Sequence, residues 1–291
     1  MAIEVILLSV FAALTWGISS FVAGSTSRRL GAQQTAFATQ ITNLVVIAPL
    51  ALLLPGRWSP GSAAWGALAA LGGAVGFVAI YRAMALGSMG VAVKLQSGLI
   101  ALVPFVIGVG TGDRPSVGAI GGVGLILLSV TMLAFAPNAK QANEVHAAGS
   151  PSEGSSRHRA SQLALLSGLC FGVAILPMAQ TSTQEGLVPL VSYRIGIVLV
   201  LYVLLRSRSG RPQLSRREWG PLAAAGTLSA VGDAAFLTAL QMGPLSIVPA
   251  ITALSPGVTA VLARCLGRDK IRPIQACGIV VGLIGLIVMN F

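Results

Sequence analysis

The sequence predicts an all-α polytopic membrane protein in which ten transmembrane helices form two inverted halves of five. Hydrophobic residues make up 55% of the chain and charged residues only 9%, with a mean hydropathy of +0.84. A soluble domain usually carries about 25% charged residues, so this composition indicates an integral membrane protein. One long polar segment, residues 136–160, divides the apolar sequence into two stretches of nearly equal length.

Each predicted helix is an apolar run of about 20 residues, the length that spans the hydrocarbon core of a bilayer. Runs such as 280–289 are continuously apolar, whereas membrane strands alternate, so helices are the expected element. The first half contains predicted helices at 3–23, 32–54, 62–86, 90–110 and 115–135. The second half contains them at 161–180, 187–205, 219–240, 244–266 and 273–290.

Residues 136–160 are rich in serine, glycine, proline and charge, and they contain both histidines. Such a composition forms neither a packed core nor a membrane span, so it predicts a solvent-exposed linker. The predicted organisation is therefore a first five-helix repeat (1–135), a polar linker (136–160) and a second five-helix repeat (161–291).

Positive charge predicts the orientation of the chain. If all ten helices span, every Lys and Arg except Arg57, Arg114 and Arg194 lies on one side of the membrane. The positive-inside rule makes that side cytoplasmic, with the linker inside and both termini outside. These loop charges account for the net charge of +11, and nucleic acid is not an expected partner. The first run lacks a basic n-region, so we expect it to be an uncleaved span.

The two halves share short motifs at a shift of about 155 residues. Trp16-Gly17 corresponds to Phe171-Gly172, and Leu102-Val103-Pro104 resembles Leu254-Ser255-Pro256. Several matches in the same order indicate a duplication. Because five is odd, the second half must enter the membrane from the opposite side. This inverted-topology repeat is typical of secondary transporters, whose substrates bind near mid-membrane between the repeats.

The chain resembles the drug/metabolite transporter superfamily, specifically the ten-helix exporters built from two EamA-type domains. The motifs that carry the resemblance are Trp16-Gly17, Ser255-Pro256 and the acidic-basic pair before the Gly-rich last helix. An arginine often found in the second helix of such domains matches Arg194, and Gln40 replaces it in the first half. The resemblance implies export of small metabolites across a bacterial inner (plasma) membrane. Amino acids and amphiphilic compounds are the cargo that it most commonly implies.

Arg194 is a charge inside a predicted span, which is costly and usually functional. Asp233 lies at the same depth, since each residue is seven positions from the outer end of its helix, or about 10 Å at 1.5 Å per residue. We therefore predict that the two side chains pair. Two interpretations of the pair remain open: a purely structural ion pair, or an arginine that also attracts a substrate carboxylate.

Aromatic and uncharged polar residues within the helices are further candidates, because a ring offers apolar area and a hydroxyl or amide binds a zwitterion without fixed charge. The same residues would look identical if they only packed or bonded between helices. The predicted substrate-binding residues are Trp16, Ser20, Gln40, Asn43, Phe77, Tyr81, Gln96, Phe171, Tyr193, Arg194, Asp233 and Thr252.

Small residues and prolines predict how the helices pack and bend. Gly118-x3-Gly122 and Gly278-x3-Gly282 allow close helix contact, so the fifth and tenth helices are expected to serve packing or a dimer interface. Pro104 and Pro256 are expected to kink their helices. A monomer or a homodimer is compatible with this pattern.

The function predicted from these features is alternating-access export of small metabolites, with amino acids as the expected cargo. Alternative cargoes are amphiphilic drugs or cations, and phosphate- or lipid-linked compounds, although the latter need more basic residues than Arg194. An intramembrane enzyme is disfavoured because both histidines lie in the linker and no catalytic motif occurs. No cofactor or metal is expected. Asp233 is the one good candidate for proton coupling, and pairing would keep it charged, which favours facilitated diffusion.

Overall fold

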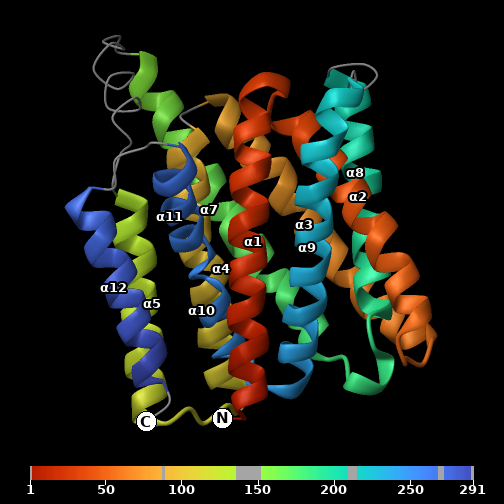
Figure 1. Cartoon of the computed structure of the whole chain (residues 1–291), viewed down its shortest axis with the longest axis vertical. Helices are drawn as coiled ribbons and strands as arrows, with labels where there is room; N and C mark the ends of the chain where they lie inside the picture. The colour runs from red at the N-terminus through yellow and green to blue at the C-terminus, as the bar shows by residue number, and fades with distance from the viewer. Residues whose placement is uncertain (1, 87–88, 136–151, 209–214, 268–271, 290–291) are drawn as a thin grey trace.

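The computed structural model describes residues 2–86, 89–135, 152–208, 215–267 and 272–289, and every regular element in these ranges is helical (Figure 1). The helices of the first half are α1 (Ile3–Leu30), α2 (Ala32–Leu53), α3 (Pro60–Leu86), α4 (Met89–Thr111) and α5 (Val117–Phe135). The second half contains α7 (Ser152–Ala179), the 3-10 turn η1 (Thr183–Glu185), α8 (Val188–Arg208), α9 (Arg216–Met242), α10 (Val248–Thr252), α11 (Ser255–Gly267) and α12 (Pro273–Val288).

Length and hydropathy divide the apolar helices of these described ranges into two groups. Seven stretches are long and apolar enough to cross a bilayer. Three further apolar helices are shorter: Gln96–Thr111, Val117–Leu133 and Pro273–Val288. They coincide with the predicted fourth, fifth and tenth helices. The all-helical, multi-pass fold class is confirmed, and the count of ten spans in two sets of five stays a prediction.

The boundary between linker and second half differs from the prediction. α7 begins at Ser152, so residues 152–160, which were expected to belong to the linker, are helical. This first part of α7 is polar, and His158 and Gln162, one turn apart, hydrogen-bond at 3.0 Å. Side-chain bonds at this spacing stabilise a helix without any apolar face. The rest of the predicted linker lies outside the described residues.

The predicted ninth helix (244–266) is broken into α10 and α11. Pro256 has no N–H, so it cannot donate to the carbonyl of Thr252 one turn earlier. The N–H of Gly257 donates instead to the carbonyl of Leu254 at 2.9 Å, which tightens the chain at the break. Pro104, at the corresponding position of the first half, lies inside an unbroken α4. The expected distortion at Pro256 is therefore observed as a full break, whereas the expected kink at Pro104 does not interrupt its helix.

Helices of the first half pack mainly on helices of the second half. α1 packs on α9, α10 and α11, while α3 packs on α7 and α8, and α4 packs on α7. α2 lies against α8 and α9, and α5 lies beside α12 at one edge of the molecule (Figure 1). The contacts that bury most side chains therefore lie between the halves, and a site formed there draws residues from both.

Glycines set the distance between α5 and α12. A Cβ at Gly122 would lie 2.5 Å from the carbonyl oxygen of Gly285, and one at Gly285 would lie 2.8 Å from that of Gly122. These separations are too short for any larger residue, so the helices touch backbone to backbone. Close packing through the glycine pattern is confirmed, while a role of these helices in dimerisation stays a prediction.

The direction of the chain is visible in Figure 1. α1 begins at the lower end of the view and rises, whereas α7 begins at the upper end and descends. Loops at the lower end are joined across the halves: Asp113 accepts a hydrogen bond from the Ser246 N–H at 2.8 Å, and the Arg57 N–H donates to the Gln184 carbonyl at 2.7 Å. These bonds hold the two halves together at that end.

Candidate functional site

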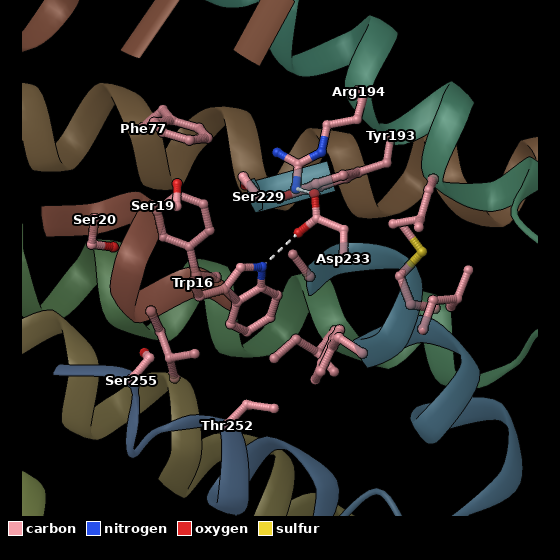
Figure 2. A pocket seen from close by; sticks show the side chains of 18 residues that line it. Trp16, Ser19, Ser20, Phe77, Tyr193, Arg194, Ser229, Asp233, Thr252 and Ser255 are labelled. Atoms are coloured by element: carbon pink, nitrogen blue, oxygen red, sulfur yellow. Dashed lines mark hydrogen bonds and ion pairs between the residues drawn. The ribbon is translucent and has the colours of Figure 1, made fainter. Parts of the chain in front are cut away.

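A cavity of about 420 Å³ lies between the two halves (Figure 2). Such a volume falls in the range of small-molecule sites, about 300–1,000 Å³. Its walls come from α1, α3, α4, α7, α8, α9, α10 and α11. The lining residues are Trp16, Ser19, Ser20, Phe77, Ile100, Phe171, Ala174, Ile175, Met178, Leu190, Tyr193, Arg194, Ser229, Asp233, Phe236, Leu237, Thr252 and Ser255.

Arg194 of α8 and Asp233 of α9 form an ion pair in the cavity wall. The guanidinium Nη2 donates to Asp233 Oδ2, which confirms the predicted pairing. Arg194 is 7% exposed and Asp233 4% exposed, so both charged side chains are almost completely buried within the protein. A buried charge without a partner is far more costly than a buried pair, and this explains why the two occur together.

Two further donors bind the carboxylate of Asp233. The indole Nε1–H of Trp16 donates to Oδ1 at 3.1 Å, and the amide Nδ2 of Asn43 donates to Oδ2 at 2.6 Å. The same amide lies 3.1 Å from the Ser229 hydroxyl, one turn before Asp233 on α9. α1, α2 and α8 are therefore all attached to one carboxylate on α9, and the attachment crosses between the halves.

Arg194 has two further contacts besides the carboxylate of Asp233. Its Nη1 donates to Oε1 of Gln40 on α2, and its guanidinium lies 5.1 Å from the centre of the Tyr193 ring, within reach of a cation–π interaction. The Nε of Arg194 is buried and has no hydrogen-bond partner among the described residues. The guanidinium is thus fixed by side chains of two neighbouring helices, Asp233 of α9 and Gln40 of α2.

The indole of Trp16 is fixed by its neighbours on α9. A Cβ at Gly232 would lie 2.6 Å from Trp16 Cδ1 and 2.8 Å from its Nε1, so only glycine leaves room for the ring. The Phe236 ring packs on the indole with a centroid distance of 5.2 Å. Figure 2 shows the indole nitrogen directed at Asp233, and the same side chain lines the cavity.

A second aromatic pair lies across the cavity, where Phe77 of α3 meets Phe171 of α7 edge to face at 4.9 Å. A Cβ at Gly76 would lie 2.8 Å from the Phe171 ring, so glycine again makes room for an aromatic side chain. Both rings line the cavity and present only carbon to it.

The structure gathers most of the predicted site residues around one cavity. Its lining includes Trp16, Ser20, Phe77, Phe171, Tyr193, Arg194, Asp233 and Thr252 from that set. Gln40 and Asn43 do not line it, because both side chains are used by the ion pair. Gln96 lies on α4 outside the lining, and Tyr81 lies on α3, where its side chain is outside the described residues. Whether any of them binds substrate stays a prediction.

Several lining residues carry no signal in the sequence. Ile100, Ile175, Met178 and Leu237 are aliphatic side chains of apolar helices, and nothing in the pattern separates them from residues that face lipid. Ser229 could have been found, because it lies four residues before Asp233 and therefore on the same helix face. Within the described ranges no group of three His, Cys, Asp or Glu residues is placed to bind a metal ion.

Comparison with known proteins gives a family match for the second half and a shared fold for the whole chain. Residues 158–291 match the family described as "EamA-like transporter family". No curated protein sequence matches the chain. Among solved structures 29 chains match, including one described only as "Crystal structure of protein". That structure is 15% identical with a TM-score of 0.76, over 99% of this chain and 98% of the other, so it shows a shared fold.

Proposed function

We propose that this chain is a membrane transporter that exports amino acids or similar small metabolites by alternating access, because residues 158–291 match the EamA-like transporter family. The observation that carries the proposal is the cavity of about 420 Å³ between the halves, with a buried Arg194–Asp233 pair in its wall. A binding site between two inverted repeats is the arrangement that alternating access requires.

The packing of the helices supports two related halves of five helices each. The pairing of α1 with α9 has its counterpart in α7 with α3, and that of α2 with α9 in α8 with α3. α5 pairs with α12, which occupies the equivalent place in the other half. Helices α1 and α7, equivalent in the repeat, run in opposite directions (Figure 1). Such reciprocal pairing is what an inverted repeat of residues 1–135 and 161–291 would produce.

The proposed location is a bacterial inner membrane with the segment after α5 in the cytoplasm and both termini outside. α8 and α11 end, and α9 begins, at the upper end of Figure 1, where α5 also finishes and α7 starts. Arg206, Arg216 and Arg264 belong to these ends of α8, α9 and α11. We expect protease added to inside-out vesicles to cut the chain between α5 and α7, giving two fragments of similar size. Cleavage in right-side-out spheroplasts instead would reverse the proposed orientation.

Facilitated diffusion is the proposed mode of energy coupling. Asp233 is the carboxylate of the cavity lining, and Arg194, Trp16 and Asn43 all bind it. Proton antiport generally needs an intramembrane group that is released to exchange its proton during the cycle. The cargo would then move down its own gradient.

A cavity-filling variant tests the proposal. In proteoliposomes, Ser20→Trp should reduce efflux of a preloaded amino acid mixture by more than about tenfold, since a large ring would occupy the site. Ser20 lines the cavity and its side chain is exposed, so a larger side chain at this position should not prevent folding. Leu199→Trp is the matched control, because Leu199 is 59% exposed and does not line the cavity. Equal efflux by both variants would exclude this cavity as the route.

A further inference from the structure

The cavity has two chemically different walls, and each wall takes helices from both halves. One, here called the polar wall, consists of the lining residues of α1, α9, α10 and α11: Trp16, Ser19, Ser20, Ser229, Asp233, Phe236, Leu237, Thr252 and Ser255. The other, the apolar wall, consists of those of α3, α4 and α7: Phe77, Ile100, Phe171, Ala174, Ile175 and Met178. Every hydroxyl and carboxylate in these two sets belongs to the polar wall, and Leu190, Tyr193 and Arg194 of α8 complete the lining outside both sets.

The contrast follows the repeat. With Trp16 aligned on Phe171, Ser19 and Ser20 of α1 correspond to Ala174 and Ile175 of α7. With Leu254-Ser255-Pro256 aligned on Leu102-Val103-Pro104, Thr252 corresponds to Ile100. In each pair the polar member lies on the polar wall and the apolar member on the apolar wall. Equivalent positions of the two repeats have thus acquired opposite chemistry.

The helix break adds to the polar wall. Thr252 and Ser255 flank the break between α10 and α11, and both line the cavity. Pro256 leaves the Thr252 carbonyl without its helical donor, and broken helices present such carbonyls to polar ligands in membrane transporters. In the first half, Ile100 occupies the equivalent place on an unbroken α4.

The fixed charges of the lining cancel. Arg194 is the cationic and Asp233 the anionic residue among the lining side chains, and they pair with each other. A cargo with a net charge would have to bring that charge into the bilayer without an opposite one to receive it, which is strongly unfavourable. A cargo that is neutral overall, including a zwitterion, avoids this cost.

Building on the proposed transport function, we propose that the cargo is a small amphiphile of zero net charge with one polar head and one apolar group. The head lies on the polar wall beside Ser20 and Thr252, and a branched aliphatic or aromatic group lies against Ile175 and Ile100. The two walls fix the orientation of the molecule. Compounds that are polar at both ends, or that carry net charge, are rejected by the apolar wall and the neutralised pair.

Amino acids with one head group and different side chains test this directly. Phenylalanine and leucine have an apolar group, glutamine is polar at both ends, and lysine carries net charge. Counterflow of each labelled compound in proteoliposomes should favour phenylalanine or leucine over glutamine and lysine by at least about tenfold, as expected for burying a hydrocarbon group against an apolar surface. Ile175→Ser and Ile100→Thr, which copy the equivalent residues of the polar wall, should each reduce that preference several-fold.

Leu199→Ser is the matched control, since it makes a similar change at an exposed position outside the cavity and should leave the preference unaltered. The two wall variants change different helices, so one of them remains informative if the other does not fold. Transport of glutamine or lysine as fast as phenylalanine, or a preference that both wall variants retain, overturns the inference and leaves the transport function standing. Failure of the wild-type protein to move any of the four compounds contradicts both.

Discussion

Asp233→Ala is expected to lower the free energy of unfolding by about 3–5 kcal/mol and to abolish transport. The substitution leaves the Arg194 guanidinium buried, at 7% exposure, without its anionic partner. It also removes the acceptor of the Trp16 and Asn43 hydrogen bonds, so α1 and α2 each lose a hydrogen bond to α9. Denaturant unfolding of the purified protein in detergent, followed by tryptophan fluorescence, measures the loss.

Asp233→Asn is the matched control for size and hydrogen bonding, because its amide oxygen still accepts from Trp16 but carries no charge. Asp233→Asn should therefore recover only a minor part of the stability that Asp233→Ala loses. If Asp233→Ala were as stable as the wild type, the claim that the ion pair stabilises the packing of these helices would be contradicted.

The exchanged pair, Arg194→Asp with Asp233→Arg, separates the two interpretations of Arg194. If the pair is purely structural, the double variant should recover both stability and transport that each single variant loses. If Arg194 also attracts a substrate carboxylate, the double variant should recover stability but not transport, because the charge then projects from α9 instead of α8.

Trp16→Phe is expected to reduce transport by about tenfold or more while lowering the free energy of unfolding by only about 1.5–3 kcal/mol, the range for a hydrogen bond to a charged group. Phenylalanine keeps the aromatic contact with Phe236 and loses the N–H that Asp233 accepts at 3.1 Å. Because Trp16 lines the cavity beside Asp233, a ring without this hydrogen bond should be free to move into the space that the cargo needs.

Trp65→Phe makes the same chemical change on α3, at a residue that is 38% exposed and does not line the cavity. It should leave transport unaltered. Initial rates of efflux and unfolding curves for the two variants give the comparison. Equal rates for Trp16→Phe and Trp65→Phe would show that the indole of Trp16 has no part in the site.

The fold class and the ion pair could be predicted from the sequence because both are determined by large free energies, those of burying apolar segments and of burying a charge. Long apolar runs can only be buried in a bilayer, and a charge such as Arg194 within one requires a partner at the same depth. Asp233 was the carboxylate available, and the structure places the two in contact. The place of Trp16 and Phe171 beside the cavity likewise followed from their matching positions in the repeat.

Other features could not be predicted, because the determining interactions are local or tertiary. Pro104 and Pro256 occur in similar tripeptides, yet only the second interrupts its helix, where Thr252 and Ser255 face a cavity instead of close packing. Gln40 and Asn43 were expected to line the cavity, but their side chains hydrogen-bond to Arg194 and Asp233 instead. These bonds depend on which helices pack together, and the sequence pattern does not show this. Aliphatic residues that line the cavity carry the same pattern as those that face lipid.

Counterflow by the wild-type protein tests the central claim most directly, namely that the cavity between the halves carries a small neutral amphiphile across the membrane. Liposomes containing the protein are loaded with unlabelled phenylalanine and diluted into labelled phenylalanine, with equal pH on both sides. The account predicts transient accumulation of label above that in protein-free liposomes, because a facilitated carrier exchanges its cargo without a pH gradient. Accumulation that occurs only when a pH gradient is imposed would contradict the proposed coupling, and its absence under both conditions would contradict the claim itself.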